Sequence, residues 1–242
     1  MTNSVPEPLV SIVIPAINEE SRLPNTLHLC IDFLKQLSFG SEIVVVTDGS
    51  GDKTVQVAEL FISLFPNLRV ISYPVNRGKG FAVKMGMLEA RGQYRLFMDA
   101  DHAVPIGMLS EFLEVAQSGY DIVIGSRSHE DSKLIKQQKF FRRNLALLFR
   151  QLQKIVLRLP YEDTQCGYKL FSAAAAESLF NRMTFDCAYF DAEILYIAHK
   201  LNMTIYQHPV VWTHHPESRL PIGVKRSLQL IRLMFKIPTI HG

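Results

Sequence analysis

The sequence predicts an α/β protein with a mostly parallel central sheet and helices on both of its faces. Three observations predict this class. Short apolar segments rich in Val and Ile alternate with helix-forming segments through the first half of the chain. These apolar segments are nearly continuous, which is typical of strands buried on both faces. The chain has 242 residues, 48% of them hydrophobic, enough for one sizeable core.

The first half predicts five strands and four helices in strict alternation. The first strand ends at Pro15, because proline lacks the N–H group that a ladder needs. Ligands of such sheets lie beyond the carboxyl ends of the strands, so the loops there are the candidate site. The expected strands are residues 9–14, 42–46, 68–72, 94–98 and 121–124, and the expected helices are residues 19–37, 52–64, 81–90 and 106–117.

The second half is less regular. A strand over residues 204–212 is interrupted by His208-Pro209, and helices are expected over residues 136–159, 173–180, 191–200 and 222–237. We expect one domain over residues 1–242. Its parts are a ligand-binding half (1–125), a second half (126–215) and a basic helix (216–242).

The net charge of +3 hides an asymmetry. Residues 132–159 hold eight Lys/Arg and residues 219–242 hold five more, and neither segment has an acid. The rest of the chain carries the other 13 Lys/Arg against all 23 Asp/Glu, a net charge of −10. Two basic segments on an acidic body predict a localised polyanionic partner.

The three cysteines, Cys30, Cys166 and Cys187, are spaced too widely for a zinc pattern and cannot all pair. This favours a reducing, cytoplasmic compartment. The first eight residues do not resemble a signal peptide, and no window approaches 18 consecutive apolar residues, so we expect no membrane span.

Asp99-Ala100-Asp101 follows the fourth strand and is the most informative motif. A turn there would let both carboxylates reach one ion, and Asp favours turns. Two hard oxygen ligands leave room around Mg²⁺ or Mn²⁺ for phosphate oxygens and water. A lone D-x-D is usually an ordinary loop, so the neighbouring loops must decide.

Three other loops also follow strands. Residues 15–20 (PAINEE) offer Asn and Glu for a ribose or base, or acids for a helix start. Residues 47–54 (TDGSGDKT) place Asp48 at a strand end, with glycines that permit close backbone approach and residues that can cap a helix. Residues 76–80 (NRGKG) bring N–H groups and positive charge to a helix start, which suits an anion. They match neither a dinucleotide fingerprint nor a P-loop.

Together the four loops resemble glycosyltransferase family 2 enzymes of the GT-A fold. Residues 163–171 (DTQCGYKLF) and 190–195 (FDAEIL) are more narrowly similar to the dolichyl-phosphate or polyprenyl-phosphate β-glucosyltransferases. The resemblance covers roughly residues 10–212. It implies a nucleotide-sugar donor, with UDP-glucose favoured, a polyprenyl or dolichyl phosphate acceptor, and inversion at the anomeric carbon.

By position, the resemblance also assigns residues. Asp99 and Asp101 would hold Mg²⁺ or Mn²⁺, and Asp101, Asp163 and Arg127 would be catalytic. The donor would be bound by Pro15, Ala16, Asn18, Glu19, Asp48, Lys79, Asp99 and Ala100. The acceptor phosphate would be held by Ser126, Arg127, Arg142 and Arg143.

Three positions depart from the family pattern. Thr47 replaces the usual first Asp of D-D-G-S, which we expect to loosen base recognition. Ile17 replaces a common aromatic residue. Ala103 stands where mannosyl-transferring relatives have Gln, which favours glucose-type relatives and leaves the third metal ligand to water.

A phosphate acceptor changes what the enzyme must supply. The second pKa of a phosphomonoester lies near 6, so at neutral pH it is mostly a dianion and needs orientation more than a base. Arginine grips phosphate with two parallel hydrogen bonds. Asp163 is the candidate base if one is used, but it can equally hold an arginine or orient the acceptor.

From Phe141 onward, apolar residues repeat at helical spacing, with basic residues roughly opposite. The stripe contains Leu145, Leu148, Leu152, Ile155 and Leu159; the opposite face contains Lys139, Arg143, Arg150 and Lys154. Such a helix can lie in a membrane interface or pack on the body. We expect peripheral association with the inner face of a membrane.

Several alternatives remain open. The transferase can act on a soluble glycan or protein hydroxyl, or can be a dolichyl-phosphate mannosyltransferase that uses GDP-mannose. A non-enzymatic, membrane-bound nucleotide-sugar-binding pseudoenzyme is a third possibility, motivated by Thr47 and Ala103. Nucleic-acid binding is disfavoured, because the basic segments are interleaved with aliphatic rather than stacking aromatic residues.

Overall fold

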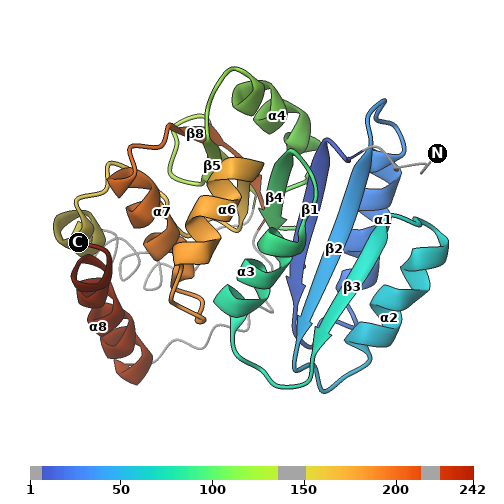
Figure 1. Ribbon diagram of the computed structural model, residues 1–242, viewed down its shortest axis with the longest axis horizontal. Coiled ribbons are helices and arrows are strands. Elements are labelled where there is room, and N and C mark those ends of the chain that lie inside the picture. Colours follow the sequence, from blue (N-terminus) through green and yellow to red (C-terminus); the bar gives the residue numbers. More distant parts are fainter. Residues whose placement is uncertain (1–6, 136–150, 214–223) are drawn as a thin grey trace, which may run out of the picture.

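Seven strands form one central sheet (Figure 1). The computed structural model describes residues 7–135, 151–213 and 224–242. The strand order is β3-β2-β1-β4-β7-β5-β8, and all neighbours are parallel except those of β7. This confirms the predicted α/β class. The strands are β1 (Val10–Ala16), β2 (Ser41–Asp48), β3 (Leu68–Tyr73), β4 (Tyr94–Met98), β5 (Ile122–Ser126), β7 (Tyr168–Ser172) and β8 (Ile205–Pro209), with a separate pair β6 (Lys133–Leu134) and β9 (Val211–Trp212).

Helices cover both faces of the sheet. One face carries α1, α2 and α4, and the other carries α3, α6 and α7, with α8 packed on α7 (Figure 1). The helices are α1 (Leu23–Leu34), α2 (Thr54–Leu60), α3 (Lys79–Glu89), α4 (Leu109–Gln117), α6 (Ala173–Arg182), α7 (Phe190–Lys200) and α8 (Val224–His241), with short 3₁₀ turns η1 (Phe61–Ser63) and η2 (Ile106–Met108).

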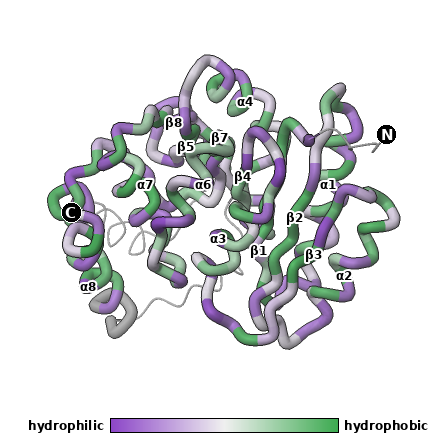
Figure 2. The backbone as a smooth tube through the Cα atoms, in the orientation of Figure 1, coloured by the Kyte–Doolittle hydropathy of each residue, from purple (hydrophilic) through white to green (hydrophobic). Residues whose placement is uncertain are grey.

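The central strands are hydrophobic because both of their faces are covered (Figure 2). Successive residues of a strand point to opposite faces. Ile12 and Ile14 therefore enter the core under α1 and α4, whereas Val13 enters the core under α3 and α6. All eight residues of β2 are buried. This double burial explains the continuous apolar runs of the sequence.

Strand β7 is absent from the elements expected from the sequence. It lies between β4 and β5 and is antiparallel to both, with Met98 opposite Tyr168 and Ile124 opposite Lys169. Lys169, the second residue of β7, interrupts the apolar pattern, and this hides the strand in the sequence. Because β7 runs backwards, its amino end lies where the parallel strands have their carboxyl ends. The 163–167 loop is thereby brought to the same edge of the sheet as the other candidate loops.

Two boundaries near the first loop differ from expectation. Strand β1 does not stop at Pro15: this residue pairs in register with Val46, and the strand ends at Ala16. Proline has an extended-compatible φ and keeps its carbonyl acceptor, so it fits near a strand end. The first helix begins at Leu23, not at residue 19, and Pro24 occupies its first turn.

The long basic helix expected over residues 136–159 lies mostly outside the described residues. Residues 151–157 are helical, and this helix ends before Arg158, whose φ is +52°. The apolar stripe divides there: Leu159 is buried and Leu152 packs on the core, but Ile155 is 72% exposed. In the described part of the chain, no helix combines the length and hydrophobicity needed to cross a bilayer.

Candidate active site

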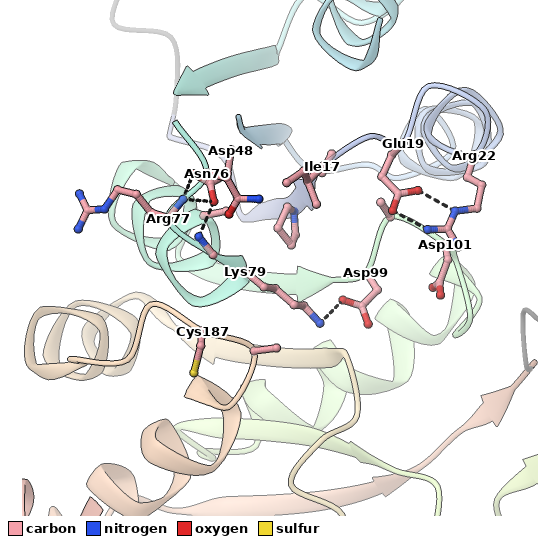
Figure 3. Close-up of a pocket in the computed structure, with 16 residues that line it drawn as sticks. Ile17, Glu19, Arg22, Asp48, Asn76, Arg77, Lys79, Asp99, Asp101 and Cys187 are labelled. Carbon is pink, nitrogen blue, oxygen red and sulfur yellow. Dashed lines mark hydrogen bonds and ion pairs between the residues drawn. The ribbon is translucent and has the colours of Figure 1, made fainter. Parts of the chain in front are cut away.

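The loops after β1, β2, β3 and β4 meet in one cavity of about 480 Å³ at the carboxyl edge of the sheet (Figure 3). A late segment, the loop between α6 and α7, completes the wall. The lining residues are Pro15, Ala16, Ile17, Glu19, Arg22, Asp48, Asn76, Arg77, Gly78, Lys79, Ala82, Asp99, Ala100, Asp101, Cys187 and Ala188. Segments that are far apart in the sequence therefore form a single concave site with charges of both signs.

Asp48 fixes the loop that follows β3. It is the last residue of β2 and is 97% buried, and its carboxylate accepts hydrogen bonds from the backbone N–H groups of Arg77 and Gly78 at 2.9 and 2.6 Å. Gly78 has a φ of +124°, which suits glycine alone. A Cβ at this position would collide with the backbone of Asp186. The loop is thus held from both sides.

Lys79 begins α3 and points into the cavity toward Asp99 (Figure 3). The Nζ atom lies 2.6 Å from Asp99 Oδ1 and 5.1 Å from the centre of the Phe97 ring. Burial alone would lower the pKa of Lys79, but the nearby carboxylates of Asp99 and Asp191 outweigh it and raise the pKa above its ordinary value. Lys79 is therefore a fixed positive charge at the site.

Asp99 and Asp101 both line the cavity, because β4 ends at Met98 and the chain turns directly after it. The Asp99 N–H donates to the Gly167 carbonyl at 3.1 Å, and Asp101 Oδ1 accepts from the Ala103 N–H at 3.1 Å. A Cβ at Gly167 would collide with the Asp99 carboxylate. The residue type at position 167 therefore controls where Asp99 can lie.

The carboxylates at this turn suit a divalent cation that shares its ligands with a substrate. Among the described residues, no group of three or more His, Cys, Asp and Glu side chains is arranged to hold a metal by itself. Asp99 and Asp101 supply hard oxygen atoms, which Mg²⁺ and Mn²⁺ prefer. An ion held here would complete its coordination with phosphate oxygens and water.

The first loop contributes a clamped pair. Glu19 is 92% buried and receives two hydrogen bonds from the guanidinium of Arg22, at 2.7 Å from Nε and 2.5 Å from Nη2. Its backbone N–H donates to Thr54 Oγ1 at 2.7 Å. Both residues of the pair line the cavity, so Arg22 joins Arg77 and Lys79 as a third cationic residue of the wall.

Asn18 is not among the lining residues. It adopts a positive φ of 54°, and its Oδ1 atom accepts a hydrogen bond from the Gly51 N–H at 2.7 Å. Its own N–H donates to Ser50 Oγ at 3.2 Å. Asn18 therefore links the loop after β1 to the loop after β2. It supports the cavity by fixing these loops, without lining the cavity itself.

A second ion pair, between Arg127 and Asp163, lies outside the lining of the cavity. Asp163 is 99% buried. It accepts from Arg127 Nε at 2.7 Å, from Nη2 at 2.8 Å and from the Arg127 backbone N–H at 3.0 Å. Burial lowers the pKa of Arg127, but the Asp163 carboxylate more than offsets this and raises it. Asp163, the candidate base or orienting group, thus holds an arginine.

Of the other predicted acceptor residues, one lies within the described residues of the chain and two lie outside them. Ser126 is the last residue of β5 and is 99% buried, and its Oγ atom has no hydrogen-bond partner among the described residues. Arg142 and Arg143 lie outside the described residues. The structure shows Arg127 paired with Asp163, and the roles of Ser126, Arg127, Arg142 and Arg143 at an acceptor phosphate stay a prediction.

A buried ion pair lies close to the cavity floor. Lys169, on β7, contacts Asp191, on α7, at 2.5 Å, and neither side chain is more than 4% exposed. Burial raises the pKa of Asp191, and the ammonium groups of Lys169 and Lys79 oppose that shift without cancelling it. The two motifs at residues 163–171 and 190–195 are therefore joined by this pair.

The sequence analysis predicted many of the residues that line the cavity but missed others. Of the eight predicted donor residues, all but Asn18 line it. Arg22 was hidden inside the expected first helix, where it reads as an ordinary surface residue. Cys187 and Ala188 carry no sequence signal of their own, since they lie far along the chain from the four predicted donor loops and reach the cavity only through the fold.

The family described as "Glycosyl transferase family 2" matches residues 11–180 of the chain. The dolichyl-phosphate beta-glucosyltransferase of Dictyostelium discoideum is 35% identical over 97% of this chain and 76% of its own length. That of Drosophila melanogaster is 40% identical over 87% and 69%, and that of Homo sapiens is 34% identical over 95% and 76%.

Solved structures of the same fold include glucosyl-3-phosphoglycerate synthase from M. tuberculosis, with a TM-score of 0.69 and 20% identity over 97% of this chain and 81% of that one. The same Mycobacterium tuberculosis enzyme, solved with Mn²⁺ and UDP-glucose, has a TM-score of 0.66 and 19% identity over 97% and 79%. At these identities the likeness establishes the fold alone.

Proposed function

The chain belongs to glycosyltransferase family 2 and is a glycosyltransferase, and from this premise we propose that it transfers glucose from UDP-glucose to a dolichyl or related polyprenyl phosphate. One structural observation carries the proposal. Lys79, Asp99 and Asp101 line one cavity at the carboxyl edge of the sheet, and Lys79 contacts Asp99 there. This combination of a cation and two carboxylates suits a diphosphate with its metal ion. Relatives named as dolichyl-phosphate glucosyltransferases match most of the chain, which supports the sugar and the acceptor class.

The donor residues divide by their charge. Asp48, Pro15 and Ala16 form the inner wall, where a nucleoside would lie against strand ends and backbone. Lys79 is positively charged at neutral pH and would bind the diphosphate. Asp99 and Asp101 would hold Mg²⁺ or Mn²⁺, which, when bound, neutralises charge on the departing diphosphate. A neighbour of the same fold has been solved with Mn²⁺ and UDP-glucose, which supports this choice.

The acceptor residues have a different task. A phosphate dianion attacks the anomeric carbon from the face opposite the diphosphate: a phosphate oxygen–carbon bond forms, the bond to the diphosphate oxygen breaks, and UDP leaves. No proton has to be removed from the attacking oxygen. Arg127 would orient the acceptor phosphate, since its side-chain bonds to Asp163 use Nε and Nη2 and do not use Nη1.

The Arg127–Asp163 pair favours a phosphate acceptor over a hydroxyl acceptor. A sugar or protein hydroxyl needs a carboxylate base within hydrogen-bonding reach. Asp163 is buried and accepts three hydrogen bonds from Arg127 and a fourth from the Gln165 N–H at 3.1 Å. A carboxylate so occupied is suited to hold an arginine.

Exposed side chains on two helices support action at a membrane surface. Ile155 is 72% exposed between the exposed cations Lys154 and Arg158. On α8, Phe235 and Ile240 are 56% and 47% exposed, next to exposed Arg232 and Lys236. Large apolar groups flanked by basic groups are typical of helices that lie in an anionic membrane interface.

A transfer assay tests the proposal. The protein is incubated with Mn²⁺, dolichyl phosphate and radiolabelled UDP-glucose, and the label is counted in the organic phase. Parallel reactions with UDP-N-acetylglucosamine and GDP-mannose, followed by mass spectrometry of the lipid, identify the sugar. We expect a glucosylated lipid phosphate with UDP-glucose. Lipid labelling by GDP-mannose alone would overturn the glucose assignment, and no labelled lipid with any donor would overturn the acceptor.

A further inference from the structure

Helix α8 is connected to the wall of the donor cavity through one buried carboxylate. We propose that His241, in the last turn of α8, is a positioning residue that holds the loop of residues 183–188 against the cavity through Glu193. The inference rests on the proposed function only for the identity of the ligand in that cavity. It makes the position of α8 a determinant of donor binding.

Glu193 lies in the first turn of α7 and is fully buried. Its Oε1 atom accepts hydrogen bonds from the Thr184 N–H at 2.9 Å and the Thr184 hydroxyl at 2.6 Å, and its Oε2 atom accepts from the Phe185 N–H at 2.8 Å. His241 Nε2 donates to Oε1 at 2.7 Å. A carboxylate offers about four acceptor sites, so the loop and His241 together satisfy it.

The same loop is bound to the start of α3. The Phe81 N–H donates to the Asp186 carbonyl at 3.2 Å, and Lys84 Nζ donates to the Met183 carbonyl at 2.8 Å. The Asp186 carboxylate pairs with Arg77 at 3.1 Å. Arg77 itself lines the cavity. Displacement of the loop would therefore displace groups that line the donor site.

The loop also supplies part of the wall directly. Cys187 and Ala188 line the cavity, and Figure 3 shows the labelled Cys187 on the side of Lys79 away from Asp48. The backbone carbonyls of Phe185 and Cys187 lie so close to Gly80 that a Cβ there would collide with both. Such close packing transmits a shift of the loop to α3, because densely packed interiors have little free volume to absorb it.

A change in the position of helix α8 would be transmitted to Glu193 through His241. Its Met234 and Ile237 side chains are fully buried, and the helix packs on α7. Phe235 and Ile240, the groups assigned above to a membrane interface, are exposed on either side of these buried residues. A change in how α8 is seated would move His241 and, through Glu193, the wall of the donor cavity.

Alkylation of Cys187 tests the proposal without any ligand. Cys30 and Cys166 are buried, and burial raises the pKa of both thiols to about 12, so Cys187 is the thiol expected to react at pH 8. We expect His241→Ala to raise the rate of Cys187 alkylation by iodoacetamide, and to weaken UDP binding in calorimetry, each by about three- to tenfold. UDP should protect Cys187 in the wild type.

Two variants separate positioning from a general folding defect. His241→Gln keeps an N–H donor near the Nε2 position, so it should restore both the slow alkylation and the UDP affinity. His199→Ala, which removes an exposed histidine at the end of α7, should change neither. If His241→Ala does not fold, Thr184→Val removes a hydrogen bond to the same carboxylate from the loop side and should show the same two effects.

The outcomes are distinct. Unchanged alkylation and unchanged UDP affinity in His241→Ala, or no rescue by His241→Gln, would overturn the proposal. If the wild type binds no UDP while His241→Ala still accelerates alkylation, the coupling of α8 to the cavity stands and the donor assignment fails. The inference and the proposed function can therefore fail separately.

Discussion

Two ion pairs at the carboxyl edge of the sheet differ in how far each is open to solvent. In the Lys79–Asp99 pair the side chains are 31% and 34% exposed and share one contact of 2.6 Å within the cavity. In the Arg127–Asp163 pair they are 21% and 1% exposed and are joined by three hydrogen bonds. An open pair can exchange its partners for a ligand at small cost, whereas a closed pair cannot.

Under the proposed function, this difference gives the two pairs complementary tasks. Lys79 and Asp99 would neutralise each other until a diphosphate and its cation bind, and each would then take a partner of opposite sign. Arg127 would stay fixed by Asp163, with Nη1, which those bonds do not use, available to the acceptor phosphate. On this proposal the open pair would satisfy the charges of the donor site between turnovers, and the closed pair would set the direction of acceptor approach.

The largest loss of activity should come from a substitution in the cavity that contains the open Lys79–Asp99 pair. Asp101→Asn removes a charged oxygen from the proposed cation site, and we expect kcat/KM for glucosyl transfer to fall by about 10²- to 10³-fold. The thermal midpoint should stay within a few degrees of the wild type. Asp32→Asn, an exposed carboxylate on α1, is the matched control and should leave activity unchanged. A fully active Asp101→Asn variant would refute the cation assignment.

The closed pair is tested by Arg127→Lys. Lysine keeps the charge but cannot make the two-pronged contact with Asp163, so the ammonium group should lose its fixed direction. We expect KM for the lipid phosphate to rise about 10- to 100-fold, while UDP affinity stays within twofold. Steady-state kinetics with the acceptor varied measure the first, and calorimetry the second. Arg91→Lys, at an exposed arginine, serves as the control.

A loss confined to kcat in Asp163→Asn, with an unchanged acceptor KM, would contradict this account. That result would mean that Asp163 acts as a base. An equal loss of UDP affinity in Arg127→Lys would mean that the two pairs do not have separate tasks.

The charge of Lys79 can be followed through pH. Its pKa is raised above the ordinary value of 10.5, so the ammonium is fully present below that pH and is lost only as pH rises through the higher, folded-state value. Lys79→Met should weaken UDP binding about tenfold, and that ratio should stay constant from pH 7.5 to 9.5 in calorimetry. A ratio that shrinks toward pH 9.5 would show that the pKa is lowered instead.

The strand pattern of the sequence predicts where Lys79 and Asp99 lie, whereas Arg127 and Asp163 came only from the family resemblance, for a physical reason. Asp48, Lys79 and Asp99 follow strands of a parallel sheet, and parallel strands place such residues at one edge without further information. Asp163 reaches that edge only because β7 runs antiparallel between β4 and β5, with buried Lys169 as its second residue. Local hydrophobic pattern does not report such a strand, since tertiary burial of the Lys169–Asp191 pair sets it.

The contribution of Arg22 and Cys187 to the cavity could not be predicted from the sequence either. Arg22 enters the wall because the first helix starts four residues later than its composition suggests, which leaves residues 19–22 as a turn. Cys187 enters because Glu193 holds its loop by hydrogen bonds between residues eight and nine positions apart. Both depend on hydrogen bonds that only the folded chain creates.

The smallest effect on ligand binding should come from a substitution at the contact between the Asp163 loop and the Lys79–Asp99 pair. Gly167 belongs to the loop that carries Asp163, yet a Cβ there would collide with the carboxylate of Asp99. Because Asp99 is one-third exposed, it can turn aside, so Gly167→Ala should lower the free energy of unfolding by only about 1 kcal/mol, at the low end for overpacking. UDP affinity should fall a few-fold as the Lys79–Asp99 contact is disturbed, measured by calorimetry beside denaturant unfolding. Gly107→Ala, where a Cβ meets nothing within 4 Å, should change neither quantity. If Gly167→Ala raised the acceptor KM and left UDP affinity intact, the loop would serve Arg127 alone, and the two pairs would be independent rather than joined through position 167.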